Sequence, residues 1–467
     1  MSVILIYPPQ FDKKFSNPFI SEPSLPPLGI ASIAAYLEKF EIPVKIIDAS
    51  ILNLSFPQLI KILKKINPCV IGITAQTQNI NRSVTTANII KNEFPDIPII
   101  FGGPHPTILP EETLKAVPAV DFIVIGEGEV STLEIINAIY SNRNFESIKG
   151  IGFRKNQTIK INSPRPYIED LNILPFPARH LLPLTLYKPN PLLYKRTPVT
   201  SAIVSRGCPY QCKFCSKTIW GNNIRERSAE KVFEEILLLK NEYNVNEIVF
   251  LDDVFTLHKK RVIEICDLIL KNKVDISWSC ITRVDAINRA LLLSMKKSGC
   301  HQIAFGIESG NESILNLINK RITLDQVKKA FEICRKVGIE TRAYFILAFP
   351  TETREMSYQT IAFAKKINPD YAYFYIYVPY PGTELWEIAE EKGQILNRDW
   401  NHFSRWDPNY IPDNRTAKEI KNTFKSAYRL FYLRLKYMAN RLKAVKNIGD
   451  FRKNFELIIQ YIKGMID

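Results

Sequence analysis

Three cysteines lie close together in the segment Ser205-Arg206-Gly207-Cys208-Pro209-Tyr210-Gln211-Cys212-Lys213-Phe214-Cys215. Clustered thiolates bind soft metals and iron–sulfur clusters. Cys208, Cys212 and Cys215 can ligate three irons of one [4Fe–4S] cluster, and no fourth cysteine lies nearby for the remaining iron. That iron is then open to an amino-acid-like chelator. A zinc site is the alternative, but zinc frameworks usually pair two short Cys/His dyads.

Charged residues follow three predicted strands further along the chain. Asp252 and Asp253 come after one strand, Arg283 ends the next, and Glu308 ends a third. Since the carboxyl ends of parallel strands share one edge, these groups should face the cysteine loop. A carboxylate there could pair with an ammonium group. The alternatives are helix capping for the aspartates and a solvated arginine. Arg206, Lys213 and Lys217 should favour thiolates over thiols in the loop.

The elements that position these residues form a second series of alternating strands and helices. Helical patterns over 229–243, 259–271, 290–298 and 324–337 separate the strands. A closed eight-stranded barrel usually needs about 250 residues, and this series is shorter, so we expect an open, partial parallel (β/α)6 barrel. The six expected strands are Ser201–Ser205, Glu247–Leu251, Ile276–Thr282, Gln302–Gly306, Thr341–Phe349 and Tyr371–Val378.

The N-terminal part alternates five continuously apolar runs with helical patterns such as Leu28–Lys39 and Phe56–Ile66. The runs predict strands buried on both faces, so we expect an α/β, doubly wound, Rossmann-like domain. In such folds the ligand lies beyond the carboxyl ends of the strands. The expected strands are Val3–Tyr7, Val44–Asp48, Val70–Thr74, Ile99–Gly102 and Phe122–Gly126.

We divide the chain by composition into four parts. Residues 1–140 form the Rossmann-like domain, residues 141–196 a proline-rich extended connector, residues 197–400 the partial barrel, and residues 401–467 a basic helical region. In the last part, Phe424, Tyr428, Phe431, Leu435 and Met438 follow helical spacing.

The net charge of +15 is concentrated at the C-terminus, where residues 415–467 contain 13 Lys and Arg against 4 Asp and Glu. The simplest interpretation is a helix that packs on the barrel with a solvated basic face. A surface that contacts anionic lipid is the alternative. We expect no nucleic-acid partner, since no recognised RNA-binding motif accompanies the charge. The N-terminus shows no signal peptide, and no apolar run is long enough to span a membrane, so we expect a cytoplasmic, at most membrane-peripheral, protein.

Residues 196–400 resemble the core of radical S-adenosylmethionine enzymes. The cysteine motif, Phe250-Leu251-Asp252-Asp253-Val254-Phe255, Gly306-Ile307-Glu308-Ser309-Gly310 and Phe345–Thr353 each match a strand-end motif of that family. In the last of these, Ala348 and Thr351 replace the usual glycines. Pro379-Tyr380-Pro381-Gly382 matches a turn that follows the sixth strand. The resemblance implies that S-adenosylmethionine contacts Phe214, Asp252, Asp253, Arg283, Glu308 and Leu347.

The N-terminal domain resembles the cobalamin-binding module that is fused to one subclass of these enzymes. The matching segments are Pro26-Pro27-Leu28-Gly29, Ile47-Asp48-Ala49, Thr74–Asn79, Gly102-Gly103-Pro104-His105 and Gly126-Glu127-Gly128-Glu129. No histidine has the context of the usual cobalt-ligand motif, so we expect His105 to hydrogen-bond the corrinoid periphery or its own loop. The implied cobalamin contacts are Leu28, Gly29, Thr74, Gln76, Thr77, Gly102, Gly103, His105, Gly126 and Glu127.

Together the resemblances cover residues 1–400 and imply a class B radical S-adenosylmethionine methyltransferase. The cluster, reduced by an external flavodoxin- or ferredoxin-like donor, would cleave S-adenosylmethionine to methionine and a 5′-deoxyadenosyl radical. That radical would abstract hydrogen from an unactivated carbon of a small-molecule or lipid-like substrate, which then takes a methyl group from methylated cobalamin. Cyclisation or oxidation without methylation stays open, as does a non-catalytic cobalamin or metal sensor. A methylthiotransferase is disfavoured because the first domain contains only Cys69.

Overall fold

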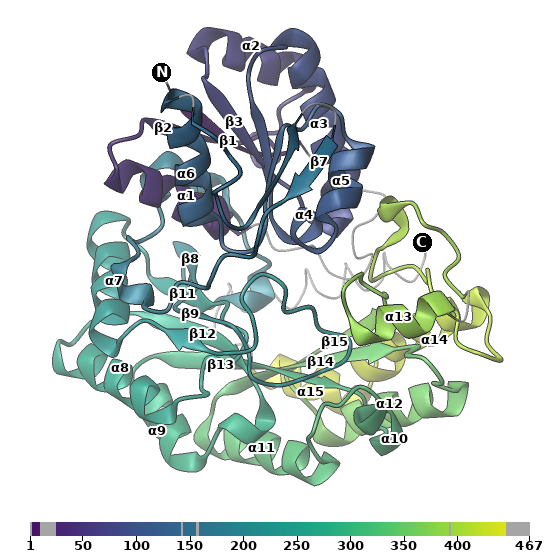
Figure 1. The fold of residues 1–467 in the computed structure, drawn as a ribbon. Coiled ribbons are helices and arrows are strands. Elements are labelled where there is room, and N and C mark those ends of the chain that lie inside the picture. The colour runs from purple at the N-terminus through teal and green to yellow at the C-terminus, as the bar shows by residue number, and fades with distance from the viewer. Residues whose placement is uncertain (1, 10–24, 142, 156–157, 392–393, 445–467) are drawn as a thin grey trace.

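The computed structural model describes residues 2–9, 25–141, 143–155, 158–391 and 394–444. Within these residues the chain forms two large β-sheets, each with its own helices and hydrophobic core. The N-terminal domain lies over the barrel sheet, and the C-terminal helices lie beside the last barrel strands (Figure 1).

The first sheet has the order β2-β1-β3-β4-β5-β6-β7. Its first five strands are parallel, which confirms the predicted Rossmann-like domain. Four of these strands have the predicted bounds, and β5 ends two residues earlier than expected. The strands are β1 (Val3–Tyr7), β2 (Val44–Asp48), β3 (Val70–Thr74), β4 (Ile99–Gly102), β5 (Phe122–Val124), β6 (Ile151–Lys155) and β7 (Thr158–Ile161).

Helices cover both faces of this sheet, as continuously apolar strands require. One apolar cluster joins α1 and α6 to the sheet, and a second joins α2, α3 and α5 to the opposite face. The helices of this part are α1 (Leu28–Lys39), α2 (Phe56–Ile66), α3 (Ile80–Glu93), α4 (Pro104–Ile108), α5 (Pro110–Ala116) and α6 (Gly128–Ser141).

The segment 141–196 differs from the expected extended connector. Strands β6 and β7 form an antiparallel hairpin whose first strand pairs with β5. The hairpin therefore extends the first sheet. Its strands are short, and only β6 buries apolar residues, so the surrounding prolines hid the pattern. The rest of the segment contains four short 3-10 turns between extended stretches.

The second sheet is parallel throughout, with its six strands in chain order from β8 to β15. This confirms the partial barrel. The strands are β8 (Val199–Ala202), β11 (Glu247–Phe250), β12 (Ser277–Thr282), β13 (Cys300–Glu308), β14 (Glu340–Leu347) and β15 (Tyr371–Ile376). The helices between them are α7 (Ala229–Glu242), α8 (Lys259–Lys271), α9 (Arg289–Lys297), α10 (Glu312–Leu317), α11 (Leu324–Val337) and α12 (Arg354–Ile367).

Between β8 and α7 the chain makes a two-stranded antiparallel ribbon, β9 (Ser205–Arg206) with β10 (Arg225–Glu226). The cysteine loop is the connection between these two strands. The ribbon therefore holds the loop at the carboxyl ends of the barrel strands, beneath the N-terminal domain (Figure 1).

Three helices follow the barrel: α13 (Glu384–Glu391), α14 (Ala417–Tyr432) and α15 (Leu435–Ala444). Phe424, Tyr428 and Phe431 are buried on α14, as their spacing predicted. The predicted single stripe is broken, however, because α14 ends at Tyr432 and Leu435 is 82% exposed. Residues 445–467 of the predicted basic region lie outside the described residues.

No helix in the described part of the chain combines the length and the apolar character needed to cross a bilayer.

Candidate active site

The cysteine loop is fixed by its own turn and by backbone bonds to the barrel. Gly207 has φ +90°, and a Cβ there would lie 2.2 Å from the Asn223 carbonyl oxygen, so only glycine fits. Further along, the Lys213 amide donates to the Ile318 carbonyl at 3.0 Å, and the Lys213 carbonyl accepts from the Leu385 amide at 3.2 Å. The loop is therefore anchored to α10 and α13 on either side.

Two of the three thiols in the loop lie in a setting that disfavours free thiolates. All three are free cysteines. Burial raises the pKa of Cys208, and it raises the pKa of Cys215 to about 12, with the Asp253 carboxylate and the neighbouring thiols adding to the effect. Lys217 lowers the pKa of Cys208, as expected of a nearby cation, but burial outweighs it. Thiols that need positive charge to ionise suit ligation by a cluster of irons.

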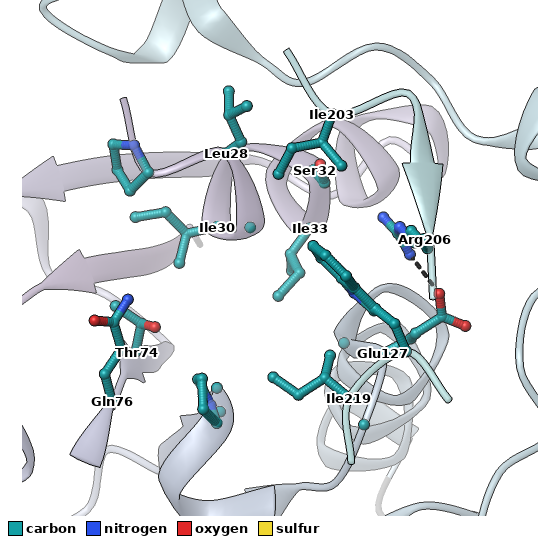
Figure 2. A pocket seen from close by; sticks show the side chains of 18 of the residues that line it. Leu28, Ile30, Ser32, Ile33, Thr74, Gln76, Glu127, Ile203, Arg206 and Ile219 are labelled. Atoms are coloured by element: carbon teal, nitrogen blue, oxygen red, sulfur yellow. Dashed lines mark hydrogen bonds and ion pairs between the residues drawn. The ribbon is translucent and has the colours of Figure 1, made fainter. Parts of the chain in front are cut away.

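A cavity of about 1060 Å³ lies between the carboxyl ends of the first sheet and the cysteine loop. Cys208 and Cys215 lie in its wall. Figure 2 shows Ile33 of α1 and Ile219 of the cysteine loop extending toward the same space from different sides. Nine of the ten predicted cobalamin contacts line this cavity: Leu28, Gly29, Thr74, Gln76, Thr77, Gly102, Gly103, Gly126 and Glu127.

Glycines open this cavity to a large ligand. A Cβ built on Gly29 would meet nothing within 4 Å, and one on Gly102 would meet only the Val124 side chain, at 3.9 Å. Gly103 has φ +104°, and its Cβ would lie 2.8 Å from the Ala75 carbonyl oxygen. The wall is thus bare backbone at several points, which fits a bulky planar group such as a corrin.

His105 is the predicted contact that does not line the cavity. Its ring is buried, and its Nδ1 lies 3.3 Å from Thr77 Oγ1. The ring of Trp400 packs edge-on against it, with 5.0 Å between the ring centroids. Burial lowers the His105 pKa to about 4, so the ring is neutral at pH 7. This bond joins His105 to the loop after β3 and not to its own loop, so it differs from the bond within its own loop that we expected. A bond to the corrinoid periphery stays a prediction.

Glu127 is held by charges from the barrel rather than standing free in the cavity. Its Oε1 accepts from Arg206 Nη1 at 2.8 Å, and both its oxygens accept from Arg225 Nη1 at 2.9 Å. Glu129 Oε1 accepts from Arg206 Nη2 at 2.5 Å, and the Ile168 amide donates to Glu127 Oε2 at 2.8 Å. Figure 2 shows the Arg206–Glu127 pair at the cavity edge. The pair therefore ties the N-terminal domain to the strand that leads into the cysteine loop.

A second cavity, of about 330 Å³, lies at the carboxyl ends of the barrel strands. Four of the six predicted S-adenosylmethionine contacts line it: Phe214, Asp253, Arg283 and Glu308. Asp253 carries a carboxyl whose pKa is raised by burial. These four residues bring one aromatic ring, two carboxyl groups and one guanidinium to the cavity, which Lys320, Arg405 and four tyrosines also line. Such groups are the donors and acceptors that an amino acid and a ribose require.

Glu308 reaches this cavity through strained backbone. Its φ is +71°, and the β13–β14 register shifts between Gly306 and Glu308. The side chain turns back toward Lys320, whose Nζ donates to Glu308 Oε1 at 2.8 Å. A Cβ on Gly306 would lie 2.5 Å from that same oxygen, so the glycine makes room for the ion pair. Strain of this kind persists where the surrounding structure enforces it and is typical of functional sites.

Arg283 is oriented by three neighbours. Its guanidinium lies 3.6 Å from the Tyr210 ring centroid, pairs with Asp285 at 2.9 Å, and donates to the Lys320 carbonyl at 2.9 Å. Its Nη1 is buried with no hydrogen-bond partner. An unsatisfied buried donor of this kind is costly, and an anionic ligand group would satisfy it.

Two predicted contacts lie outside the smaller cavity. Asp252 is buried and accepts from the Val204 amide at 3.0 Å and from Ser205 Oγ at 2.5 Å, so it fixes the chain just before the cysteine loop. Leu347 is buried in the core, while Ile346 lines the cavity. Successive side chains of a strand point to opposite sides, so a shift of one residue reverses which of the two faces the ligand.

Sequence reasoning missed Lys320 as a site residue and assigned no role to Tyr380. Lys320 follows α10 in no recognisable motif, and only the fold brings it to Glu308. Tyr380 lies in the Pro379–Gly382 turn, which matches a turn of the family, so the sequence marked its position. The contacts of Tyr380 appear only in the fold.

Two family models match this chain. The B12 binding domain matches residues 21–136, and the Radical SAM superfamily matches residues 202–364. An uncharacterized methyltransferase of Pyrococcus horikoshii is 38% identical over 442 residues, which cover 94% of this chain and 93% of that protein. The chain belongs to the cobalamin-binding radical S-adenosylmethionine enzyme family.

Other relatives agree with this assignment. The anaerobic magnesium-protoporphyrin IX monomethyl ester cyclase of Rubrivivax gelatinosus is 30% identical, with 92% of this chain and 80% of that protein covered. Among solved structures, the cobalamin-dependent radical enzyme OxsB superposes with a TM-score of 0.76 at 18% identity, covering 100% of this chain and 72% of that one. The methyltransferase TsrM from Kitasatospora setae superposes with a TM-score of 0.70 at 15% sequence identity. The match covers 92% of this chain and 89% of TsrM. At these identities the two structures establish the fold.

Membership of the cobalamin-binding radical S-adenosylmethionine family confirms the predicted enzyme class and cofactors. The chain is an enzyme that uses a [4Fe–4S] cluster, S-adenosylmethionine and cobalamin, and it acts on a small molecule. The described residues fit these groups: the glycine-lined larger cavity suits cobalamin, the smaller cavity suits S-adenosylmethionine, and the cysteine loop lies between them.

Proposed function

We propose that this enzyme methylates an unactivated carbon atom of a small-molecule or lipid-like substrate. The observation that supports this most strongly is the arrangement of two cavities around one cysteine loop, with Cys208 and Cys215 in the wall of the larger cavity and Phe214 in the wall of the smaller. Methyl transfer by cobalamin requires both cofactors to reach the same substrate, and adjoining cavities allow this. The names of three relatives also support the proposal, because they are a methyltransferase, a cytidylyl-2-hydroxyethylphosphonate methyltransferase and a hopanoid C-3 methylase.

In this proposal the cluster supplies the electron that cleaves S-adenosylmethionine, and cobalamin carries the methyl group. Cys208, Cys212 and Cys215 hold the cluster. Asp253 accepts from the methionine ammonium, and Arg283 uses its unpartnered Nη1 for the carboxylate or a ribose oxygen. Glu308, oriented by Lys320, accepts from the ribose hydroxyls.

The surrounding apolar residues shield the reacting atoms. Ile281, Ile346 and Val378 line part of the smaller cavity beside the polar groups, and they would exclude water from that part. A radical that can abstract hydrogen from carbon would also react with loosely held molecules, and an apolar wall limits such side reactions. On the cobalamin side, the bare backbone of Gly29 and Gly102 takes the place of side chains, and Thr74 and Gln76 supply polar contacts to the amide groups of the corrin edge.

Cyclisation without methylation is the second candidate, because the cyclase of Rubrivivax gelatinosus is 30% identical to this chain. The two reactions differ in their products. Methylation releases S-adenosylhomocysteine and 5′-deoxyadenosine together, whereas cyclisation or oxidation releases 5′-deoxyadenosine alone. Both nucleosides should therefore be quantified by chromatography, with extracts of the source cells supplying candidate substrates.

The cluster assignment has its own test. Wild type and Cys212→Ala are reconstituted anaerobically with iron and sulfide. We expect the variant to lose the broad visible absorbance of the cluster and the reductive cleavage of S-adenosylmethionine. Cys69→Ala is the matched control, since Cys69 contacts Tyr140 and Ser2 far from the loop. Cleavage that persists in Cys212→Ala would contradict the assignment.

We further propose a flavodoxin- or ferredoxin-like electron donor and a membrane contact through the basic C-terminal region. The apolar face of α14 is covered by the barrel, so the exposed basic residues of α14, such as Lys421 and Arg429, carry this second proposal. Sedimentation with vesicles of anionic and of neutral lipid tests it: binding to neither kind would contradict the proposal.

A further inference from the structure

Two described residues, Asp253 and Tyr380, line both cavities. Asp253 follows β11, and Tyr380 lies in the turn after β15, at the other end of the barrel sheet. The other described lining residues belong to one cavity or the other. Asp253 and Tyr380 therefore lie at the boundary between the cavity for S-adenosylmethionine and the cavity for cobalamin.

Tyr380 is anchored to the N-terminal domain. Gln78 Nε2 donates to the Tyr380 hydroxyl at 2.7 Å, a bond between residues 302 positions apart. Gln78 belongs to the short turn after β3 and itself lines the larger cavity. The Phe403 carbonyl lies farther from the Tyr380 hydroxyl, at 3.5 Å.

The turn that carries Tyr380 is rigid and packs against the same domain. Pro379 and Pro381 flank the tyrosine and restrict the backbone. Thr383 Oγ1 donates to the Tyr380 carbonyl at 2.8 Å. Gly382 has φ +73°, and a Cβ there would lie 2.9 Å from the Ile108 side chain of α4. The ring is therefore held from its own turn and from across the domain boundary.

We propose that Tyr380, held by Gln78, is a positioning residue that partitions the two cavities and keeps the 5′-deoxyadenosyl radical away from the cobalt. The proposal rests on the proposed function, because it needs both cofactors in their cavities. An aromatic ring at a shared boundary blocks direct contact between ligands on its two sides. The partition leaves the radical to meet the substrate and not the corrin.

The unwanted reaction has a defined product. One electron from the cluster cleaves the sulfonium C–S bond and gives methionine and the 5′-deoxyadenosyl radical. Dithionite supplies the one electron that reduces bound hydroxocobalamin to cob(II)alamin. If the cavities merge, the unpaired electron of the radical would pair with that of cob(II)alamin, and one cobalt–carbon bond would form with no further electron. The product, adenosylcobalamin, is stable in the dark and is separable from hydroxocobalamin by chromatography.

The first experiment uses the full chain with reconstituted cluster, bound hydroxocobalamin, S-adenosylmethionine and dithionite, in the dark and without substrate. The adenosylcobalamin formed is measured relative to 5′-deoxyadenosine. We expect a low ratio for wild type and for Tyr380→Phe, which keeps the ring. For Tyr380→Ala we expect a rise of roughly tenfold or more, because contact between two reactants strongly raises their effective concentration. Tyr380→Leu serves if the alanine variant does not fold.

Equal ratios in wild type and in the ring-deleted variants, with cobalamin bound and S-adenosylmethionine cleaved in each, would overturn the partition alone. A wild type that releases no 5′-deoxyadenosine would overturn the proposed function and the partition with it. The two failures are thus distinguishable.

The second experiment does not depend on activity. A double-mutant cycle combines Gln78→Ala and Tyr380→Phe, and urea unfolding of the full chain gives each unfolding constant. A hydrogen bond between them predicts a coupling of about three- to tenfold in that constant. Additive effects would overturn the role of Gln78 as the anchor of the partition.

Discussion

Ala348 and Thr351 have φ of +65° and +64°, left-handed values that favour glycine. The family motif has glycine at both positions, and this chain keeps the backbone course without it. Thr351 is the more costly of the two, because a β-branched residue rarely adopts this conformation. The loop is held in place regardless, by Glu352, whose buried carboxylate accepts from the Phe349 amide at 2.9 Å and from Ser357 Oγ at 2.6 Å.

We therefore expect Thr351→Gly to stabilise the protein. A left-handed backbone conformation destabilises a non-glycine residue in the folded state by about 1–2 kcal/mol. Glycine removes this penalty, but its greater freedom in the unfolded chain offsets about 0.5–1 kcal/mol of the gain. The free energy of unfolding in urea should rise by about 0.5–1 kcal/mol. Thr353→Gly is the matched control: Thr353 caps α12 with φ −77°, so its loss should destabilise. Destabilisation by Thr351→Gly would contradict the argument.

The buried carboxyl of Asp252 makes the stability of the protein depend on pH. Burial raises its pKa to about 6, from an ordinary value of 3.8, despite the bonds from Ser205 and Val204. The unfolded chain therefore loses this proton before the folded chain does. The contribution of Asp252 to stability is full below pH 3.8 and is lost as the pH rises through 6.

We expect the stability of wild type, relative to Asp252→Asn, to fall by about 2 kcal/mol between pH 4 and pH 6. Asparagine keeps the shape and can accept from the Val204 amide but does not titrate. Urea unfolding of both proteins at several pH values measures the difference. A difference that is constant, or that grows with pH, would show that the folded carboxyl is not protonated at pH 5.

At the scale of elements, α14 completes the edge of the barrel sheet. The strand β15 is the last of its sheet, and its outer backbone groups would be exposed to other chains. The Tyr428 hydroxyl bonds the Phe374 amide at 3.2 Å and its carbonyl at 3.0 Å, and the Tyr432 hydroxyl bonds the Ala372 amide and carbonyl at 3.0 and 2.8 Å. The helix thus satisfies four edge groups with two side chains.

Replacing both tyrosines with phenylalanine tests how much their hydroxyl groups stabilise the protein. The double variant Tyr428→Phe/Tyr432→Phe keeps the packing but leaves four buried backbone groups without partners, and we expect a loss of about 2–4 kcal/mol in unfolding free energy. Tyr243→Phe, at the C-terminal cap of α7, is the matched control and should cost less. Equal losses in the two proteins would contradict the role of the hydroxyls.

The hairpin β6–β7 shows the limit of composition as a guide to domains. We propose that the cobalamin-binding unit extends to about residue 161, because this hairpin pairs with β5. Limited proteolysis of the full chain would support this proposal if early cleavage falls after the hairpin and not between β5 and β6.

At the scale of the whole molecule, a buried ion-pair network joins the two large parts. Glu127 and Glu129 come from the N-terminal domain, and Arg206 and Arg225 come from the ribbon that holds the cysteine loop. All four side chains are at least nearly nine-tenths buried, with Arg206 the most exposed at 12%. The relative position of the two cavities thus depends on charge pairing across the boundary.

We expect Glu127→Gln to destabilise the protein by about 3 kcal/mol, because removing one partner of a buried pair leaves the other charge uncompensated. The affinity for hydroxocobalamin should fall as well, since the cavity wall includes this residue. Glu134→Gln is the matched control, because Glu134 pairs with Arg165 at a more exposed site. Urea unfolding and a cobalamin titration measure both effects. Variants that behave alike would contradict the role of the network.

The sequence by itself determined the parallel strands of both large sheets, most helices and the cysteine motif, but not the antiparallel strands β6, β7, β9 and β10. Apolar runs of continuous and alternating character depend on local chemistry, so β1 to β4 and the helices α1, α2, α8 and α11 have the predicted bounds. The three cysteines, Asp253, Arg283 and Glu308 stand at strand ends for the same reason, since parallel strands bring their carboxyl ends to one edge.

Only the tertiary structure decided which of these polar groups are left for a ligand. Glu127 is bound by two arginines, Asp252 by a backbone amide and a serine, and His105 by Thr77 of the loop after β3. Lys320 and Gln78 gained roles that no motif marks. Each partner comes from a distant element, and a side chain's remaining hydrogen-bonding capacity depends on what the fold places next to it, which no local pattern contains.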